Sequence, residues 1–222
     1  MLFLGDIMSK NIDYWESLLR EMPATYKKSL DKENDYLIKN ITKNSKVLEV
    51  GCGGGRSLNQ LLCKTENIVG IDNDKKAVDL AKNNLRGHPK IKLIKCEARK
   101  LPFKANSFDF VICMTTFANF GKEKFKILSE MKRTVKPRGS IIMSVYANNA
   151  FKERMKIYKK LKIPLQKIVG TTVFLKEENG RHVISEQFSK AELTGIFNRA
   201  KLRVIEIKRI GILYACKLKK PR

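Results

Sequence analysis

The chain has 222 residues, of which 46 are Lys or Arg and 22 are Asp or Glu, so its formal net charge is +24. This length suits one large domain, and 43% hydrophobic residues are enough for a packed core, which excludes a disordered polybasic tail. No segment approaches the roughly 18 consecutive apolar residues of a membrane helix. We therefore expect no membrane partner, and the first residues do not resemble a secretory signal. Met1 and Met8 both remain candidate initiators.

The positive charge is spread unevenly along the chain. Residues 1–146 hold 27 basic and 16 acidic residues, a net of +11, and residues 147–222 hold 19 and 6, a net of +13. Two explanations fit this excess of positive charge. The lysines are simply solvated side chains of a Lys-rich composition, or they form a basic surface that binds an anionic partner. Both interpretations stay open, and the second places an anionic substrate or RNA near the C-terminal third.

The cysteines and histidines bear on metals and on redox state. They are Cys52, Cys63, Cys96, Cys113, Cys216, His88 and His182. No two cysteines form a Cys-x-x-Cys pair, so the pattern predicts neither a metal site nor a disulfide framework. Free thiols suit a reducing compartment, and we expect a cytoplasmic location.

The first 146 residues alternate between helical and strand patterns. Apolar residues at helical spacing predict two helices within residues 11–40, separated by Pro23. The elements expected next are strand 46–50, helix 57–62, strand 68–72, helix 74–85, strands 91–96 and 108–114, helix 122–136, a turn at 137–139 and strand 140–146. Continuously apolar strands between helices are typical of an α/β fold with a parallel sheet covered on both faces.

The regular alternation stops after Tyr146. The remaining elements expected are a basic helix at 147–168, a hairpin of 171–175 and 182–188, a helix at 189–200, and a terminal antiparallel hairpin of 202–208 and 211–218. Ser189 and Glu192 form a capping-box pattern at the start of the last helix.

A glycine-rich loop follows the first strand and opens the next helix. It contains Gly51, Gly53 and Gly55, preceded by Glu49. Glycines reach positive φ and let backbone amides approach a ligand, and a helix N-terminus favours an anionic group. Asp72 ends the second strand, where one carboxylate can accept both hydroxyls of a ribose.

The loop does not match the dinucleotide fingerprint G-x-G-x-x-G. Arg56 stands where that fingerprint requires its third glycine, and an acid at position 49 is not part of it. A carboxylate at Glu49 suits a ligand amine. The pattern therefore favours a ligand that carries both an amine and a ribose.

Five segments in chain order resemble the motifs of the class I S-adenosylmethionine-dependent methyltransferases. They are Val47–Gly55, Val69–Asp74, Cys96–Phe103, Ser107–Val111 and Lys136–Ser140. The resemblance extends from about residue 46 to residue 146, nearly half of the chain. It implies a doubly wound, seven-stranded, mostly parallel sheet of the Rossmann-like methyltransferase type, with helices on both faces and the terminal hairpin at one end.

The resemblance also suggests how one domain, 1–222, is divided. The expected parts are an N-terminal helical lid at 1–42, a cofactor-binding core at 43–146, an inserted substrate lid at 147–188, and a C-terminal helix and hairpin at 189–222 that complete the sheet.

By the same resemblance the cofactor is S-adenosylmethionine. The expected cofactor-binding residues are Glu49, Gly51, Cys52, Gly53, Asp72, Asn73, Glu97, Ala98, Met114, Tyr14 and Tyr26. Glu97 replaces the Asp that is usual in the family, and its extra methylene still reaches the adenine amino group. Tyr14 and Tyr26 lie in the segment that covers the cofactor in similar enzymes, although such aromatics can instead fasten a first helix to the core.

No acid–base constellation is evident in the sequence. The methyl group of a sulfonium is already activated, so its transfer requires alignment and exclusion of water. The catalytic candidates are therefore three residues: Tyr146 at a strand end, Asn119 where many family members carry a His-containing segment, and His182, the only histidine after residue 146. Tyr146 and Asn119 would contact or orient the acceptor, and His182 would serve as a general base.

We expect methyl transfer to a nitrogen or oxygen nucleophile of a small molecule, which is anionic if the excess positive charge is functional. This hypothesis predicts a deep cleft lined by Phe117, Asn119, Tyr146 and aromatic side chains of the lid. One alternative is a tRNA or RNA methyltransferase that uses the basic C-terminal third. Another is a non-catalytic protein that only binds the cofactor. The sequence does not predict the oligomeric state.

Overall fold

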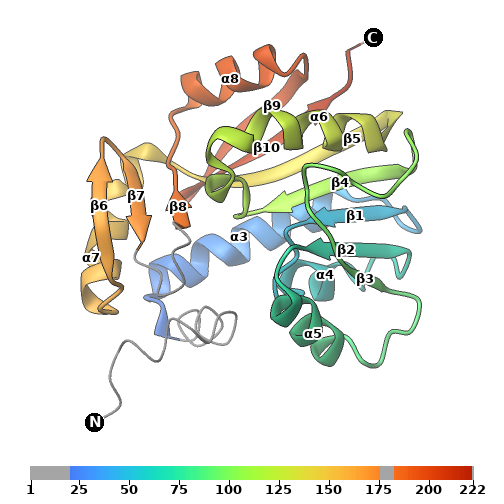
Figure 1. Cartoon of the computed structure of the whole chain (residues 1–222), viewed down its shortest axis with the longest axis horizontal. Helices are drawn as coiled ribbons and strands as arrows, with labels where there is room; N and C mark the ends of the chain where they lie inside the picture. The colour runs from blue at the N-terminus through green and yellow to red at the C-terminus, as the bar shows by residue number, and fades with distance from the viewer. Residues whose placement is uncertain (1–20, 176–182, 222) are drawn as a thin grey trace.

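One seven-stranded sheet forms the centre of the molecule (Figure 1). The computed structural model describes residues 21–175 and 183–221. The strands lie in the order β3-β2-β1-β4-β5-β10-β9. Their bounds are β1 Val47–Val50, β2 Ile68–Asp72, β3 Lys92–Lys95, β4 Phe108–Met114, β5 Val135–Tyr146, β9 Arg203–Ile210 and β10 Leu213–Lys219. Strands β1 to β5 run parallel, and β10 is antiparallel to both β5 and β9. The predicted fold class and the terminal hairpin are confirmed.

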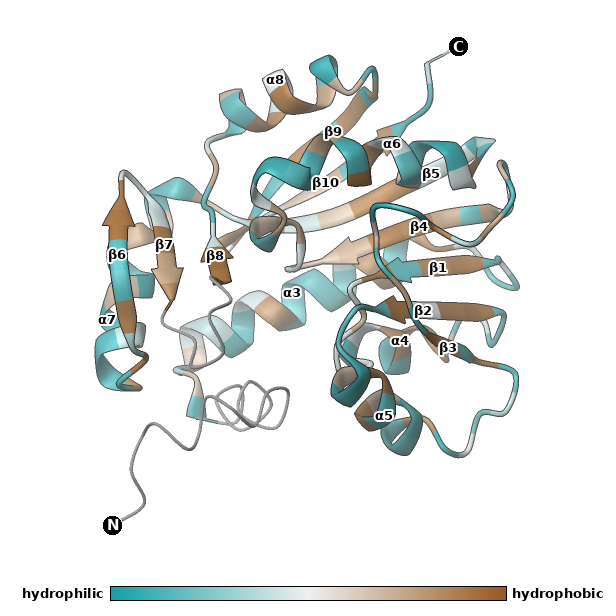
Figure 2. Cartoon of the chain, in the orientation of Figure 1, coloured by the Kyte–Doolittle hydropathy of each residue, from teal (hydrophilic) through white to brown (hydrophobic). Residues whose placement is uncertain are grey.

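Helices cover both faces because successive side chains of the central strands point to opposite sides. On one face Val47 and Ile112 pack in a cluster with apolar side chains of α3 (Ala24–Asn40) and α4 (Arg56–Leu61). On the other, Leu48 and Val111 pack with α6 (Lys124–Thr134) and α8 (Lys190–Arg199). Helix α5 (Lys75–Asn84) lies beside β2 and β3. In Figure 2 the strands of the main sheet are largely brown, whereas the helices beside them carry both teal and brown bands.

The capping box at the start of α8 is present. The Ser189 hydroxyl accepts the backbone N–H of Glu192 at 3.1 Å, and the Glu192 carboxylate accepts the backbone N–H of Ser189 at 2.6 Å. These two bonds satisfy donors that a helix N-terminus otherwise leaves free.

We expect Ser189→Ala to lower the free energy of unfolding by about 1 kcal/mol, because the Glu192 N–H loses its acceptor. Urea denaturation followed by far-UV circular dichroism measures the change. Ser129→Ala, on the exposed surface of α6, is the matched control. Equal stability of the two variants would contradict the assigned cap.

The predicted turn at 137–139 is wrong. Helix α6 ends earlier, at Thr134, and residues 137–139 belong to β5. The β4–β5 register shifts here, since Phe108 pairs with Val135 and Phe110 with Ser140. An irregular strand accommodates the proline, and a Cβ at Gly139 would lie 2.4 Å from the Asp109 carbonyl oxygen.

The predicted helix at 147–168 is shorter in the structure. A 3-10 turn, η3 (Asn148–Ala150), precedes α7 (Phe151–Lys160), and Leu165–Val169 forms the strand β6. Lys162 has a positive φ of 52°, and Pro164 disfavours a helical residue before it. Proline was the sequence signal for this boundary.

Strand β6 joins β7 (Thr172–Leu175) and β8 (Val183–Ser185) in a separate antiparallel sheet. The predicted pairing of β7 with β8 is confirmed, and its turn lies outside the described residues. Ala147 and Phe188 form a parallel bridge, and the Phe188 N–H donates to the Tyr146 carbonyl at 2.9 Å. The segment 147–188 therefore leaves the main sheet and returns to it at one point, the end of β5.

Among the described helices, none combines the length and the apolar character that crossing a membrane requires.

Candidate functional site

The glycine-rich loop between β1 and α4 is held in a conformation that needs glycine. Gly51, Gly53 and Gly55 have φ angles of 76°, 51° and 86°. A Cβ at Gly51 would lie 2.3 Å from Cγ2 of Thr116, whose hydroxyl donates to the Gly51 carbonyl at 2.9 Å. The loop thus lies directly against the end of β4, and a side chain at position 51 would open it.

Asp72 links this loop to the end of β2. Its carboxylate accepts the N–H of Gly53 and the N–H of Asp74, each at 3.0 Å. Burial raises the pKa of this carboxyl, and the two backbone N–H bonds oppose the rise. Each carboxylate oxygen keeps a lone pair for a further donor, so Asp72 can accept two hydroxyls while it holds the loop.

Glu49 is a buried carboxyl in β1 with an unused acceptor. Glu49 is only 2% exposed, and its Oε2 atom has no hydrogen-bond partner among the described residues. Burial raises its pKa to about 8, and the nearby Arg56 guanidinium only partly offsets that effect. A buried acceptor without a partner is rare in a native structure, and an ammonium group of a ligand would satisfy it.

The raised pKa of Glu49 makes the stability of the ligand-free protein depend on pH. The folded state holds this proton between about pH 4.5 and about pH 8, whereas the unfolded state releases it. Stability is therefore present at low pH and is lost as the pH rises through this window.

We expect Glu49→Gln, which stays neutral, to remove a loss of about 3.5 kcal/mol between pH 5 and pH 8. Urea denaturation at several pH values measures it. Glu66→Gln, at an exposed carboxyl, should leave the slope in place. A slope that persists unchanged in the Glu49 variant would show that Glu49 is not its source.

An ion pair that the sequence did not predict joins the first residue of α4 to a buried carboxylate of α3. Arg56 Nη2 and Glu33 Oε2 are 2.5 Å apart, and Arg56 Nη1 donates to Asn34 at 3.1 Å. The other oxygen of Glu33 accepts the Ser144 hydroxyl. The sequence signal was Arg56 itself, at the position where the dinucleotide fingerprint has glycine.

Tyr146 and Tyr26 meet at the end of β5. Their hydroxyl groups are hydrogen-bonded to each other, and their ring centroids are 6.4 Å apart. The Arg154 guanidinium carbon lies 3.5 Å from the centroid of the Tyr146 ring. Helix α3, which is distant in sequence, therefore meets β5 and the nearby α7 here. The contribution of Arg154 was also not predicted.

The other predicted cofactor residues lie at the same edge of the sheet, and they differ in exposure. Met114 and Cys52 are buried, Ala98 is half-buried, and Asn73 and Glu97 are exposed. Glu97 is engaged by Arg99, with 3.5 Å between Oε2 and Nη2. Burial raises the pKa of the Cys52 thiol, which suits packing rather than reactivity. The predicted residues Tyr14 and His182 lie outside the described residues.

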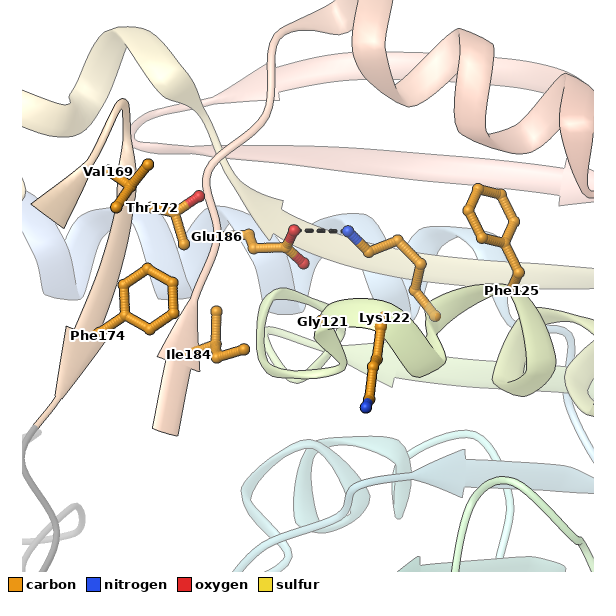
Figure 3. Close-up of a pocket in the computed structure, with 9 residues that line it drawn as sticks. Gly121, Lys122, Phe125, Val169, Thr172, Phe174, Ile184 and Glu186 are labelled. Carbon is orange, nitrogen blue, oxygen red and sulfur yellow. Dashed lines mark hydrogen bonds and ion pairs between the residues drawn. The ribbon is translucent and has the colours of Figure 1, made fainter. Parts of the chain in front are cut away.

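The predicted cleft lining differs from what the structure contains. Phe117 is fully buried and packs on Phe120, Phe188 and Phe197, so it belongs to the core, whereas Asn119 is exposed. A hollow of about 360 Å³ lies instead between the start of α6 and the small sheet (Figure 3). Its lining residues are Gly121, Lys122, Lys124, Phe125, Val169, Thr172, Phe174, Ile184 and Glu186. None of the three residues predicted to line the cleft is among them.

This hollow is bounded by an ion pair at the base of the small sheet. Lys124 Nζ and Glu186 Oε1 are 2.5 Å apart and both side chains are largely buried. Lys124 begins α6, and Glu186, labelled in Figure 3, directly follows β8. The ion pair links the end of the small sheet to helix α6, which packs on the main sheet.

Comparison with known proteins agrees with the fold and with the loop at this edge. A family model described as a methyltransferase domain matches residues 48–143. An S-adenosylmethionine-dependent methyltransferase of Clostridium acetobutylicum superposes with a TM-score of 0.68 at 13% identity, covering 96% of this chain and 99% of that one. A Pyrococcus horikoshii protein has a TM-score of 0.70 at 22% identity, covering 90% and 92%. The chain thus contains a methyltransferase domain, and its fold is that of the S-adenosylmethionine-dependent methyltransferases.

The curated relatives include demethylmenaquinone methyltransferases. That of Staphylococcus saprophyticus is 26% identical over 198 residues, which is 85% of this chain and 81% of the relative. That of Bacillus licheniformis is 31% identical over 136 residues, 60% of this chain and 56% of the relative. The match to the second protein thus spans a little over half of its length.

Proposed function

We propose that the protein transfers the methyl group of S-adenosylmethionine to a small molecule held between the sheet edge and the segment 147–188. The observation that carries this proposal is the enclosure of Tyr146. Its hydroxyl is bonded to Tyr26 of α3, and its ring is covered by Arg154 of α7. An acceptor site closed by side chains from three segments suits a small molecule better than a polynucleotide. The names of the curated relatives support the same class of acceptor.

The residues at the strand ends fit the cofactor. In our proposal Asp72 accepts the ribose hydroxyls, Glu49 accepts the ammonium group, and the backbone of Gly51 and Gly53 lies along the ligand. The unpartnered Oε2 of Glu49 supports this assignment, since an ammonium group would supply its missing donor and favour its ionised form. Glu97 and Ala98 are proposed to contact the adenine.

S-adenosylmethionine supplies a methyl group already activated on a sulfonium. The protein's part is to orient the acceptor for in-line displacement and to exclude water. We propose that the segments 1–42 and 147–188 act as the two lids, since 147–188 begins and ends beside Tyr146. A nitrogen or oxygen nucleophile is the expected acceptor atom, and the position of the methyl group in the product, assigned by NMR, tests it.

The experiment is to incubate the protein with methyl-labelled S-adenosylmethionine and fractionated cell extract, with demethylmenaquinone as a separate arm. We expect label in the small-molecule fraction. Label confined to RNA would replace this proposal with the RNA alternative, and tight cofactor binding without transfer to any fraction would support a non-catalytic protein. Asp72→Ala is the matched negative control.

A further inference from the structure

Arg154 is a buried cation in the segment 147–188. It lies in α7 and is 2% exposed. Its guanidinium lies over the ring of Tyr146, and it is 5.1 Å from the ring centroid of Tyr158. Nη2 donates to the Tyr158 hydroxyl and, at 2.9 Å, to the Ser185 hydroxyl. Both acceptors are neutral, so they satisfy donors without balancing the charge.

The rest of this guanidinium has no partner in the described part of the chain. Nε and Nη1, which together carry three of the five N–H bonds of an arginine, have no hydrogen-bond acceptor there. No carboxylate of the described residues lies within ion-pair distance of Arg154 either. The negative charge of Glu33 contributes to raising the pKa of Tyr146. This carboxylate, however, already forms an ion pair with Arg56 and accepts a hydrogen bond from Ser144.

Burying a cation without a counter-charge is costly, and proteins pair such groups or bind them to an anion. The other basic residues of α7 differ from Arg154 in their exposure to solvent. Lys152, Lys156, Lys159 and Lys160 are all exposed, while Arg154 lies on the inner face beside Tyr158. Arginine is also the basic residue whose planar fork suits oxyanions.

We infer that Arg154 binds an anionic oxygen group, a carboxylate or a phenolate, of the methyl acceptor. This inference rests on the proposed function and names the chemical class of its substrate. Contact between Arg154 and Tyr146 places the anion beside the end of β5, next to the strand ends that carry the candidate cofactor residues. Arg154 would thus fix one end of the acceptor while the nucleophile faces the methyl group.

The test measures binding rather than turnover. Protein saturated with S-adenosylhomocysteine is titrated calorimetrically with two matched pairs, 2-naphthoate against 2-naphthamide and 4-nitrophenolate against 4-nitroanisole. We expect at least one anion to bind tenfold or more tightly than its neutral counterpart, and Arg154→Met to remove that difference. The pair that shows the preference identifies the group as carboxylate or phenolate.

Two further variants separate binding from a structural role. Lys156→Met removes one charge from the exposed face of the same helix and should leave the preference unchanged. Arg154→Lys keeps the charge and should retain part of it. Equal binding of anions and neutral probes by the unaltered protein would overturn the inference, and so would an equal loss in Lys156→Met.

The melting temperature of Arg154→Met shows whether an acidic side chain of the chain itself neutralises Arg154. If an acidic side chain of the chain itself neutralised Arg154, Arg154→Met would lower the melting temperature by several degrees and no anion would bind. We expect a melting temperature within about 2 °C of the unaltered protein, since the unbranched methionine keeps apolar packing there and the loss of two hydrogen bonds is offset by the removal of an unbalanced charge. Label in a small molecule without anion binding would leave the proposed function standing and reject this inference alone.

Discussion

Asp72→Ala should lower the affinity for S-adenosylhomocysteine at least 100-fold. The substitution removes the acceptor proposed for two ribose hydroxyls, and hydrogen bonds to a charged group contribute about 1.5–3 kcal/mol each. It also frees the N–H groups of Gly53 and Asp74, which hold the loop against β2. Ligand contact and loop conformation are thus lost together.

Isothermal titration calorimetry measures this affinity, and far-UV circular dichroism checks that the variant is folded. Asp79→Ala is the matched control, because it removes the same charge from α5, where Asp79 pairs with Lys75 on the surface. Unchanged affinity in Asp72→Ala would mean that the cofactor lies elsewhere. Asp72→Asn, which keeps one acceptor oxygen, should lie between the two.

Arg56→Met should lower the free energy of unfolding by about 3 kcal/mol. Glu33 is fully buried, and its carboxylate is stabilised by the Arg56 guanidinium at 2.5 Å. Removing one partner of a buried pair leaves an uncompensated charge, which typically costs about 3–5 kcal/mol. The lower figure applies because the Arg56 side chain is 26% exposed.

The double variant Glu33→Gln, Arg56→Met tests this explanation. The amide oxygen introduced by Glu33→Gln can still accept the Ser144 hydroxyl, and no buried charge remains in the pair. We expect the double variant to recover more than half of the lost stability in urea denaturation at pH 7. Additive losses from the two single variants would show that Arg56 acts through packing.

The basic residues of α7, which contribute to the large net charge, fall into two groups, exposed and buried. In α7, four lysines face solvent and one arginine is buried. The exposed lysines are accounted for by a solvated surface, whereas Arg154 requires a specific partner. The burial of Arg154, rather than the net charge of +24, identifies it as the cation that we propose binds the substrate.

Local patterns predicted the core of the fold well. The strands 68–72 and 108–114 and the cap of α8 were predicted at the residues where they occur. Apolar periodicity and caps act within a few residues, so a sequence displays them directly. The boundary of α7 was missed although Pro164 marked it, because its basic and apolar spacing continued a helical pattern beyond that residue.

The sequence by itself determined the class of fold, the glycine loop and the two carboxyls, Glu49 and Asp72, near the ends of adjacent strands. These features follow from short-range spacing and from the rule that parallel strands end at one edge. Only the tertiary structure decided which distant groups meet there. Tyr26 reaches Tyr146 across 120 residues, and Glu33 reaches Ser144 across 111. The buried charge of Arg154 emerged in the same way, because burial and partnership are properties of packing that no local pattern contains.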